Sequence, residues 1–273
     1  MTEPAEPASP AGGGGLVRLR LDLGYDGTGF AGWASQPGLR TVQQVLEEAL
    51  GTLFRVPRVP VVVAGRTDAG VHASGQVCHC DVPAADWQEQ GGRIVRRLAG
   101  LLPPEVRVYS VAPVPAHFDA RFGALWRRYR YRICDADYGV PPLRRLDTAG
   151  WKRALDAGAM HRAGQRLLGL NDYAAFCRRR EGATTVRRLH QLTVTRTGEL
   201  VEVEVQADAF CHSMVRSLVG ALAAVGEGNR DPDWPYRLLS LGHRSDQVTV
   251  APAHGLTLLA VGYPAAAELA ARA

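Results

Sequence analysis

The feature that most constrains the fold is the strict alternation of apolar and polar residues in several short segments. Residues 16–23, LVRLRLDL, place four apolar side chains on one face of an extended chain and three charged side chains on the other. One buried face and one hydrated face are typical of antiparallel sheets. The pattern recurs in residues 126–133 and in a predicted hairpin over residues 188–210, which turns at Thr197-Gly198.

Other segments carry apolar residues at helical spacing and predict helices over residues 41–54, 91–102, 148–168 and 212–226. Thr41 is expected to cap the first of these helices, and Gly226 is expected to end the last. Further strands are expected at residues 61–63, 75–82, 107–114 and 255–264. Both halves of the chain therefore combine strands with a few helices, which predicts an α+β fold with mainly antiparallel sheet.

A candidate boundary between the two halves lies at Pro113 and Pro115. We expect a disordered tail at residues 1–15, an N-terminal α+β subdomain at 16–114, a C-terminal α+β subdomain at 115–264 and a short tail at 265–273. The first residues lack the apolar stretch of a secretory signal, and no apolar run reaches the roughly 18 residues of a membrane span. A cytoplasmic protein with no membrane partner is therefore expected.

The charge of the chain favours an acidic partner. The net charge is +5 and the sequence pI is about 9.1, and nucleic acid is the commonest acidic partner. Lys152 is the only lysine among the 32 basic residues. This arginine excess can reflect the base composition of the source genome, but it also supplies planar donors suited to phosphate and base edges.

The five cysteines are scattered, and without a secretory signal they predict no disulfide framework. Cys78-His79-Cys80 suggests a metal site, but strand alternation places His79 on the face opposite both cysteines, and no second ligand pair follows at zinc-finger spacing. Motifs for nucleotide phosphates, dinucleotides and metalloprotease zinc are also missing. We therefore expect neither a metal nor a cofactor.

Residues 64–77, AGRTDAGVHASGQV, follow three valines and present one carboxylate, Asp68, in a glycine-rich turn. Turn chemistry is one interpretation, because Asp and Gly are common turn formers. The other is catalytic, because Arg66 would favour the ionised form of Asp68, and a carboxylate can act as a nucleophile at a sugar C1′. His72, in the same segment, is either a local hydrogen-bonding residue or a direct RNA contact.

The strand WRRYRYRI, residues 126–133, places Tyr129 and Tyr131 on one face and three arginines on the other. It is either a half-buried strand with a solvated arginine face or an aromatic surface on which an unstacked base lies beside guanidinium groups. Residues 178–189 add five arginines, which form either a solvated surface or a phosphate contact.

Residues 65–77, GRTDAGVHASGQV, resemble the catalytic motif of the TruA family of tRNA pseudouridine synthases. The likeness covers residues 16–264, and its shared order argues against coincidence. The other segments that carry it are YDGTGFAGW (25–33), TVQQVLEEAL (41–50), HFDARFGALWRRYRYRI (117–133), LLGLNDYAAF (167–176), FCHSMVRSLVG (210–220) and AHGLTLLAVGYP (253–264).

The resemblance implies a pseudouridine synthase fold: two similar α+β halves, mainly antiparallel sheets with helices packed on one face, and a basic cleft between the halves. It implies an enzyme, an isomerase that converts uridine to pseudouridine at positions 38, 39 and 40 in the anticodon stem-loop of tRNA. It also implies a homodimer that needs no cofactor and no metal.

The resemblance also implies roles for single residues. Asp68 matches the catalytic aspartate, Arg66 matches the arginine of the same motif, and Arg216 matches the arginine that pairs with the catalytic carboxylate. Tyr129 matches the tyrosine that stacks on the target base, and Arg121 is expected to bind RNA. Periodicity alone would not select Arg216, because it lies off the apolar stripe of its helix, where an arginine is usually solvated.

The implied reaction explains why no cofactor is expected. It breaks the N1–C1′ bond, turns the base and joins C5 to C1′, with no net oxidation or hydrolysis. The base must first be flipped out of its stem, at a cost on the order of a few kcal/mol, which stacking on Tyr129 partly recovers. Asp68 either attacks C1′ or removes a sugar proton to give a glycal, and the sequence leaves both routes open.

Two positions depart from the family pattern. Ala34 stands where a glutamine is frequent, and Asp119 stands where a histidine is frequent, so that a negative charge is expected to weaken a phosphate contact there. Other functions stay open: a tRNA-binding chaperone without catalysis, a metal-dependent RNA hydrolase using Asp68, His72 and His79, or a pseudouridine synthase for other RNA uridines.

Overall fold

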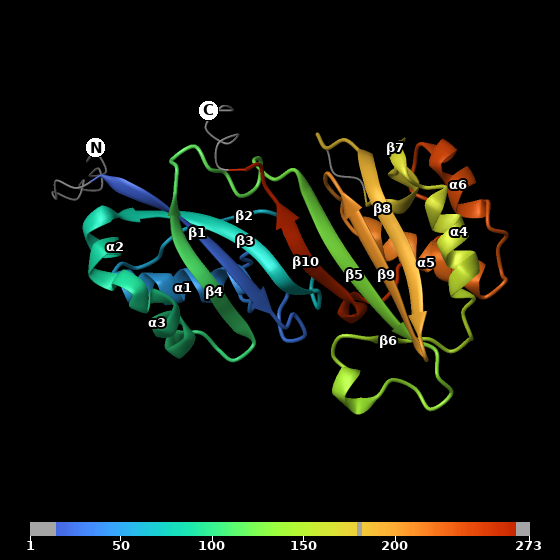
Figure 1. Ribbon diagram of the computed structural model, residues 1–273, viewed down its shortest axis with the longest axis horizontal. Helices are drawn as coiled ribbons and strands as arrows, with labels where there is room; N and C mark the ends of the chain where they lie inside the picture. Colours follow the sequence, from blue (N-terminus) through green and yellow to red (C-terminus); the bar gives the residue numbers. More distant parts are fainter. Residues whose placement is uncertain (1–14, 179–181, 266–273) are drawn as a thin grey trace, which may run out of the picture.

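The computed structural model describes residues 15–178 and 182–265, and one ten-stranded, mostly antiparallel sheet forms its centre (Figure 1). Two short strands lie beside the main path, because β2 (Val62–Val63) pairs with β3 and β6 (Ala149–Gly150) pairs with β5. From edge to edge, the path runs through β4 (Val106–Val114), β1 (Leu16–Tyr25), β3 (His72–Pro83), β10 (Leu256–Gly262), β5 (Trp126–Cys134), β9 (Leu200–Ala207), β8 (Val186–Thr197) and β7 (Gly169–Asp172). The two expected tails, residues 1–15 and 265–273, lie outside the described residues except for Gly15 and Ala265.

The helices divide between the two halves of this sheet, which confirms the expected α+β class (Figure 1). The N-terminal half carries α1 (Val42–Phe54), α2 (Ala84–Gln90) and α3 (Ile94–Leu101). The C-terminal half carries α4 (Ala157–Gln165), α5 (Met214–Gly226) and α6 (Trp234–Leu238). Short 3₁₀ turns lie at Gly91–Arg93, Pro142–Arg144, Ala174–Phe176, Leu239–Leu241 and Ala253–Gly255. Among the described residues, no helix has both the length and the apolar composition needed to span a membrane.

The last strand, β10, joins the two halves. It pairs in parallel with β3, where Thr257 lies opposite His72, and it pairs antiparallel with β5, where Leu258 lies opposite Tyr129. The strands of both halves therefore form one continuous sheet, and most of the buried apolar residues of both halves belong to one hydrophobic cluster. The proposed boundary after residue 114 falls in the loop between β4 and β5.

The expected start of one helix is wrong, whereas α5 ends at Gly226 as expected but without the expected turn at that residue. The helix expected from residue 148 begins at Ala157, because residues 149–150 pair with β5 and the carboxylate of Asp156 caps the helix by accepting the Ala159 N–H at 2.9 Å. Gly226 does not end its helix by turning the chain, since the left-handed residue is Gly228 (φ 73°). Gly226 instead allows close packing, because a Cβ there would lie 2.8 Å from Cγ of Met160.

The expected cap of α1 is confirmed. The side chain of Thr41 is fully buried and accepts the Gln44 N–H at 3.4 Å, which satisfies one of the free donors of the first turn. This cap lies directly after the loop of residues 26–40, where the helix begins, and therefore holds that end of the loop.

We expect Gly75→Ala to destabilise the junction between the halves. A Cβ at Gly75 would lie 2.0 Å from the carbonyl oxygen of Leu259 in β10, so β3 and β10 would have to separate. Overpacking of this kind costs about 1–3 kcal/mol in the free energy of unfolding, which urea denaturation measures. Gly100→Ala in α3 is the matched control, because nothing lies within 4 Å of its added Cβ. Equal unfolding midpoints for both variants would contradict this account of the junction.

Candidate active site

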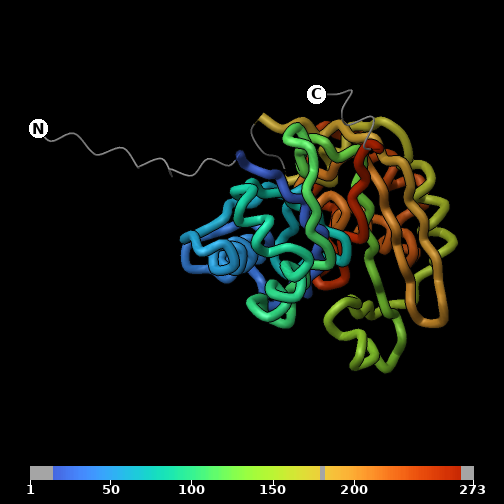
Figure 2. The backbone as a smooth tube through the Cα atoms, turned by 60° about the vertical axis from the view of Figure 1, so that its left-hand side comes forward, coloured from blue at the N-terminus to red at the C-terminus, as the bar shows by residue number. Residues whose placement is uncertain are grey.

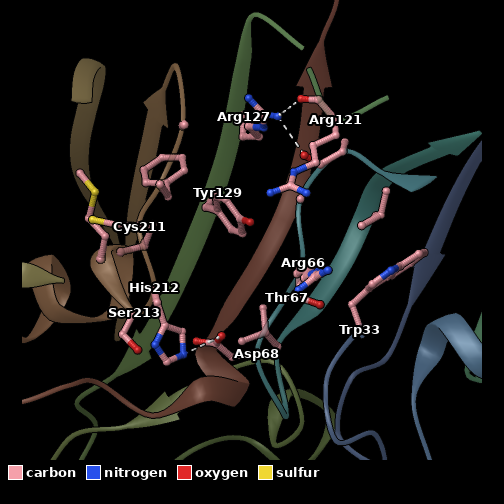
Figure 3. A pocket seen from close by; sticks show the side chains of 18 of the residues that line it. Trp33, Arg66, Thr67, Asp68, Arg121, Arg127, Tyr129, Cys211, His212 and Ser213 are labelled. Carbon is pink, nitrogen blue, oxygen red and sulfur yellow. Dashed lines mark hydrogen bonds and ion pairs between the residues drawn. The ribbon is translucent and has the colours of Figure 1, made fainter. Parts of the chain in front are cut away.

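A pocket of 730 Å³ lies where the two halves meet, and both halves line it (Figure 3). The N-terminal half contributes Trp33 and residues 61–68, which connect β2 to the turn that carries Asp68. The C-terminal half contributes Arg121, Arg127, Tyr129 and residues 209–216, which lead into α5. The structure thus brings Asp68 and Arg66 of the N-terminal half to one pocket with Tyr129, Arg121 and Arg216 of the C-terminal half.

The turn that carries Asp68 is held by buried hydrogen bonds. The hydroxyl groups of Thr67 and Tyr25 lie 2.8 Å apart, and the Gln76 side chain donates to the carbonyl of Gly65 at 2.8 Å. The backbone N–H of Trp33 donates to the carbonyl of Thr67 at 3.0 Å. Because these groups are buried, leaving any of them unpaired would be costly, and the turn has little freedom to move.

The glycines of residues 25–33, YDGTGFAGW, explain how this segment supports the turn. A Cβ at Gly27 would lie 2.1 Å from the carbonyl oxygen of Val71, so the two backbones are in direct contact. Gly32 has a φ of 96°, a conformation that L side chains rarely adopt. Gly65, in contrast, has nothing within 4 Å of an added Cβ and leaves open space beside the turn.

Two cationic or hydrogen-bonding groups from the C-terminal half face the carboxylate of Asp68. Nε2 of His212 lies 3.2 Å from Oδ1, and Nη1 of Arg216 lies 3.7 Å from Oδ2. Arg216 is itself oriented, because its Nε donates to the carbonyl of Ala251 at 2.7 Å. Within the described residues no ion pair joins Arg66 to Asp68, and Arg66 is exposed at the pocket wall. The cation beside Asp68 is therefore Arg216, not the arginine nearest in sequence.

Tyr129 forms an aromatic wall of the pocket. Tyr129 is only 8% exposed, and Figure 3 shows its ring in the pocket. The ring makes an edge-to-face contact with Phe210 at a centroid distance of 5.2 Å. Burial raises the pKa of Tyr129 well above its ordinary value, so the phenol stays neutral at physiological pH.

The pocket is strongly basic. Asp68 is the only carboxylate among the described lining residues, which include the arginines 66, 121, 127, 178, 187 and 216. Arg127 also connects the two halves, because it donates to the carbonyls of Ala64 at 2.8 Å and Asp208 at 2.7 Å. Residues 179–181 of the arginine-rich segment lie outside the described residues.

The arginines on the other face of β5 do not share this environment. Arg130 pairs with Glu204 at 2.8 Å, and Arg132 pairs with Glu202 at 2.7 Å. Because strand alternation points Arg130 and Arg132 away from Tyr129, the guanidinium groups in the pocket beside Tyr129 come from Arg127 and Arg121.

His72 does not line the pocket. Its ring is 6% exposed, its Nδ1 accepts the Gly27 N–H at 3.0 Å, and its Nε2 donates to the carbonyl of His254 at 3.0 Å. This placement favours the local hydrogen-bonding interpretation over a direct RNA contact.

The cysteines depart from the expectation in one respect. Cys177 and Cys211 form a disulfide across a Cα–Cα distance of 5.7 Å, although no disulfide framework was predicted. Their separation of 34 residues carries no recognisable spacing, and only the fold brings the start of α5 beside the Ala174–Phe176 turn. Cys78 and Cys80 are buried and free, and Nδ1 of His79 accepts the Ala120 N–H at 3.0 Å, so His79 has a structural partner.

His212 was missed by the sequence analysis. It stands four residues before Arg216 in FCHSMVRSLVG, and its place within a family segment was the available signal. No periodicity identifies it, because Ser213 has a φ of 65° and breaks the helical pattern just before α5 begins.

Comparisons with known proteins agree with this geometry. The family model described as tRNA pseudouridine synthase matches residues 24–123 and 163–264. A protein from Frankia casuarinae named tRNA pseudouridine synthase A is 62% identical over 95% of this chain and 94% of its own length. Proteins of the same name from Streptomyces avermitilis and Mycobacterium leprae are 52% and 51% identical, each over 94% of this chain and 92% or 93% of their own lengths. The chain therefore belongs to the tRNA pseudouridine synthase family.

Proposed function

We propose that this protein isomerises uridine to pseudouridine in tRNA, at positions 38, 39 and 40 of the anticodon stem-loop, with Asp68 as the catalytic carboxylate. One observation carries the proposal. A turn held by hydrogen bonds presents Asp68, the only carboxylate among the described lining residues, to a pocket lined by arginines and by the buried Tyr129. Membership of the family and the names of its relatives support the same reaction.

The pocket suits the steps of this reaction. Tyr129 and Phe210 offer an apolar, aromatic surface for a base that has left its stack, and Arg121 and Arg66 offer guanidinium groups to the phosphates on either side. Nη1 of Arg216 lies 3.7 Å from Oδ2 of Asp68, so a positive charge stands beside the carboxylate, whether that group attacks C1′ or removes a sugar proton. His72 acts indirectly, by tying Gly27 to the segment before β10.

This function needs no cofactor, and a cytoplasmic location suits a tRNA substrate. The rival with most support is a chaperone that binds tRNA through the same arginines without any chemistry. It would have no use for an oriented carboxylate in an otherwise basic pocket, so the environment of Asp68 favours the enzyme.

We expect Asp68→Asn to lower the rate of pseudouridine formation by roughly 10³-fold or more, because the amide keeps the size of the side chain but loses its charge. Tritium release from C5-labelled uridine in tRNA measures the rate, and sequence mapping of the product assigns the modified positions. The Kd for tRNA should change by less than about threefold. Asp246→Asn, at an exposed position outside the pocket, is the matched control. Turnover by Asp68→Asn at the control rate would refute the assignment.

Asp119 has a role that the sequence did not reveal. Its Oδ1 accepts the N–H groups of Arg121 and Phe122, each at 2.7 Å, and therefore holds the turn that presents Arg121 to the pocket. These two hydrogen bonds would support the contact of Arg121 with RNA, whereas the charge of the carboxylate would still oppose a nearby phosphate. Ala34, the other departure, packs partly buried against the core.

We expect Asp119→Ala to raise the Kd for tRNA roughly fivefold, because the turn loses acceptors worth about 1 kcal/mol each. Asp119→Asn keeps an acceptor oxygen and removes the charge, so its Kd should equal or fall below that of the wild type. Fluorescence anisotropy with labelled tRNA at fixed salt compares the two variants. Tighter binding by Asp119→Ala would instead show that the charge alone matters.

We also propose a homodimer. The loop of residues 136–148 projects from the body of the protein (Figures 1 and 2). The side chains of Tyr138 and Leu146 in this loop are exposed, and Leu143 has an exposed fraction of 97%. A second copy of the chain would cover such apolar side chains. Sedimentation equilibrium is expected to give twice the chain mass of 29.4 kDa, and a single-chain mass at micromolar concentration would contradict the dimer.

A further inference from the structure

We propose that His212 is a positioning residue that sets the orientation of the Asp68 carboxylate through the close contact between its Nε2 and Oδ1 of the carboxylate. This inference rests on the proposed catalytic role of Asp68. The two residues come from opposite halves of the sheet, and Figure 3 shows the imidazole of His212 beside the carboxylate at the floor of the pocket.

The two groups that face Asp68 have different roles because their distances differ. Nε2 of His212 lies 3.2 Å from Oδ1, whereas Nη1 of Arg216 lies 3.7 Å from Oδ2. Charge attraction at 3.7 Å depends weakly on direction, while an imidazole in contact with the carboxylate at 3.2 Å restricts its rotation. Arg216 therefore supplies charge, and His212 determines where the oxygens of Asp68 point.

The backbone around His212 is itself held on both sides. Cys211 is joined to Cys177 by the disulfide, and the Arg178 N–H donates to the carbonyl of His212 at 3.0 Å. Ser213 then adopts a φ of 65°, and Met214, which is 1% exposed, anchors the first turn of α5 in the core. A non-glycine residue keeps a positive φ only where the surroundings enforce it, and such residues concentrate at functional sites.

This arrangement gives Asp68 a preorganised geometry. The carboxylate is 31% exposed on the pocket side, so without His212 it would sample other rotamers in contact with solvent. A displacement of about 1 Å at a reacting group can cost roughly 10²-fold in rate. Loss of this contact should therefore lower kcat, while the arginines that bind RNA leave KM unchanged.

The test compares His212→Asn with His212→Gln. Both are neutral amides, but the amide nitrogen of glutamine occupies the place of Nε2, whereas that of asparagine occupies the place of Nδ1, one bond shorter. We expect His212→Asn to lower kcat roughly 10- to 100-fold with KM within about threefold of wild type, and His212→Gln to keep kcat within about fivefold. His243→Leu, outside the pocket, is the control for loss of a histidine.

Each variant is assayed by tritium release under saturating tRNA, and its thermal unfolding and Kd for tRNA are measured in parallel. Wild-type kcat in His212→Asn overturns the inference, and so does an equal loss of kcat in both amide variants with normal unfolding. Asp68→Asn is assayed beside them. Activity in Asp68→Asn would refute the proposed function, whereas an inactive Asp68→Asn with a fully active His212→Asn refutes only the role of His212.

Discussion

The parallel pairing of β10 with β3 is the interaction on which the rest of the structure depends. β3 follows the turn that carries Asp68. The segment before β10 holds Arg216, because Nε of Arg216 donates to the carbonyl of Ala251 and the backbone N–H of Ala251 donates to the carbonyl of Arg216. One strand thus fixes the distance between a carboxylate from the first half of the chain and its partners from the second. The active-site geometry is a consequence of a sheet that runs through both halves.

The two faces of β5 differ in the balance of positive and negative side chains. On one face of β5, Tyr129 borders a pocket whose described lining contains several arginines and one carboxylate. On the other face, Arg130 and Arg132 are neutralised by Glu204 and Glu202 across the strand pair. The positive charge of the described lining is therefore concentrated on the face of β5 that carries Tyr129, around the carboxylate of Asp68.

Local patterns predicted most of the secondary structure, because alternation and helical spacing depend only on near neighbours in the chain. They succeeded for β1, β5, the β8–β9 hairpin and α1 with its Thr41 cap. They failed for residues 148–156, where pairing of Ala149–Gly150 with β5 outweighs helical spacing, and for the role of Gly226, which ends α5 as expected but whose missing Cβ serves contact with α4. Both errors arise where a distant partner decides the conformation.

The amino-acid sequence by itself determined the α+β class, the placement of Asp68 in a glycine-rich turn after a strand, and the likeness to a family. The tertiary structure decided which groups meet Asp68: His212 and Arg216 instead of Arg66, with Cys177 bonded to Cys211 beside them. The physical reason is that strand and turn propensities act over a few residues, whereas hydrogen bonds and ion pairs depend on distances that only the completed sheet establishes.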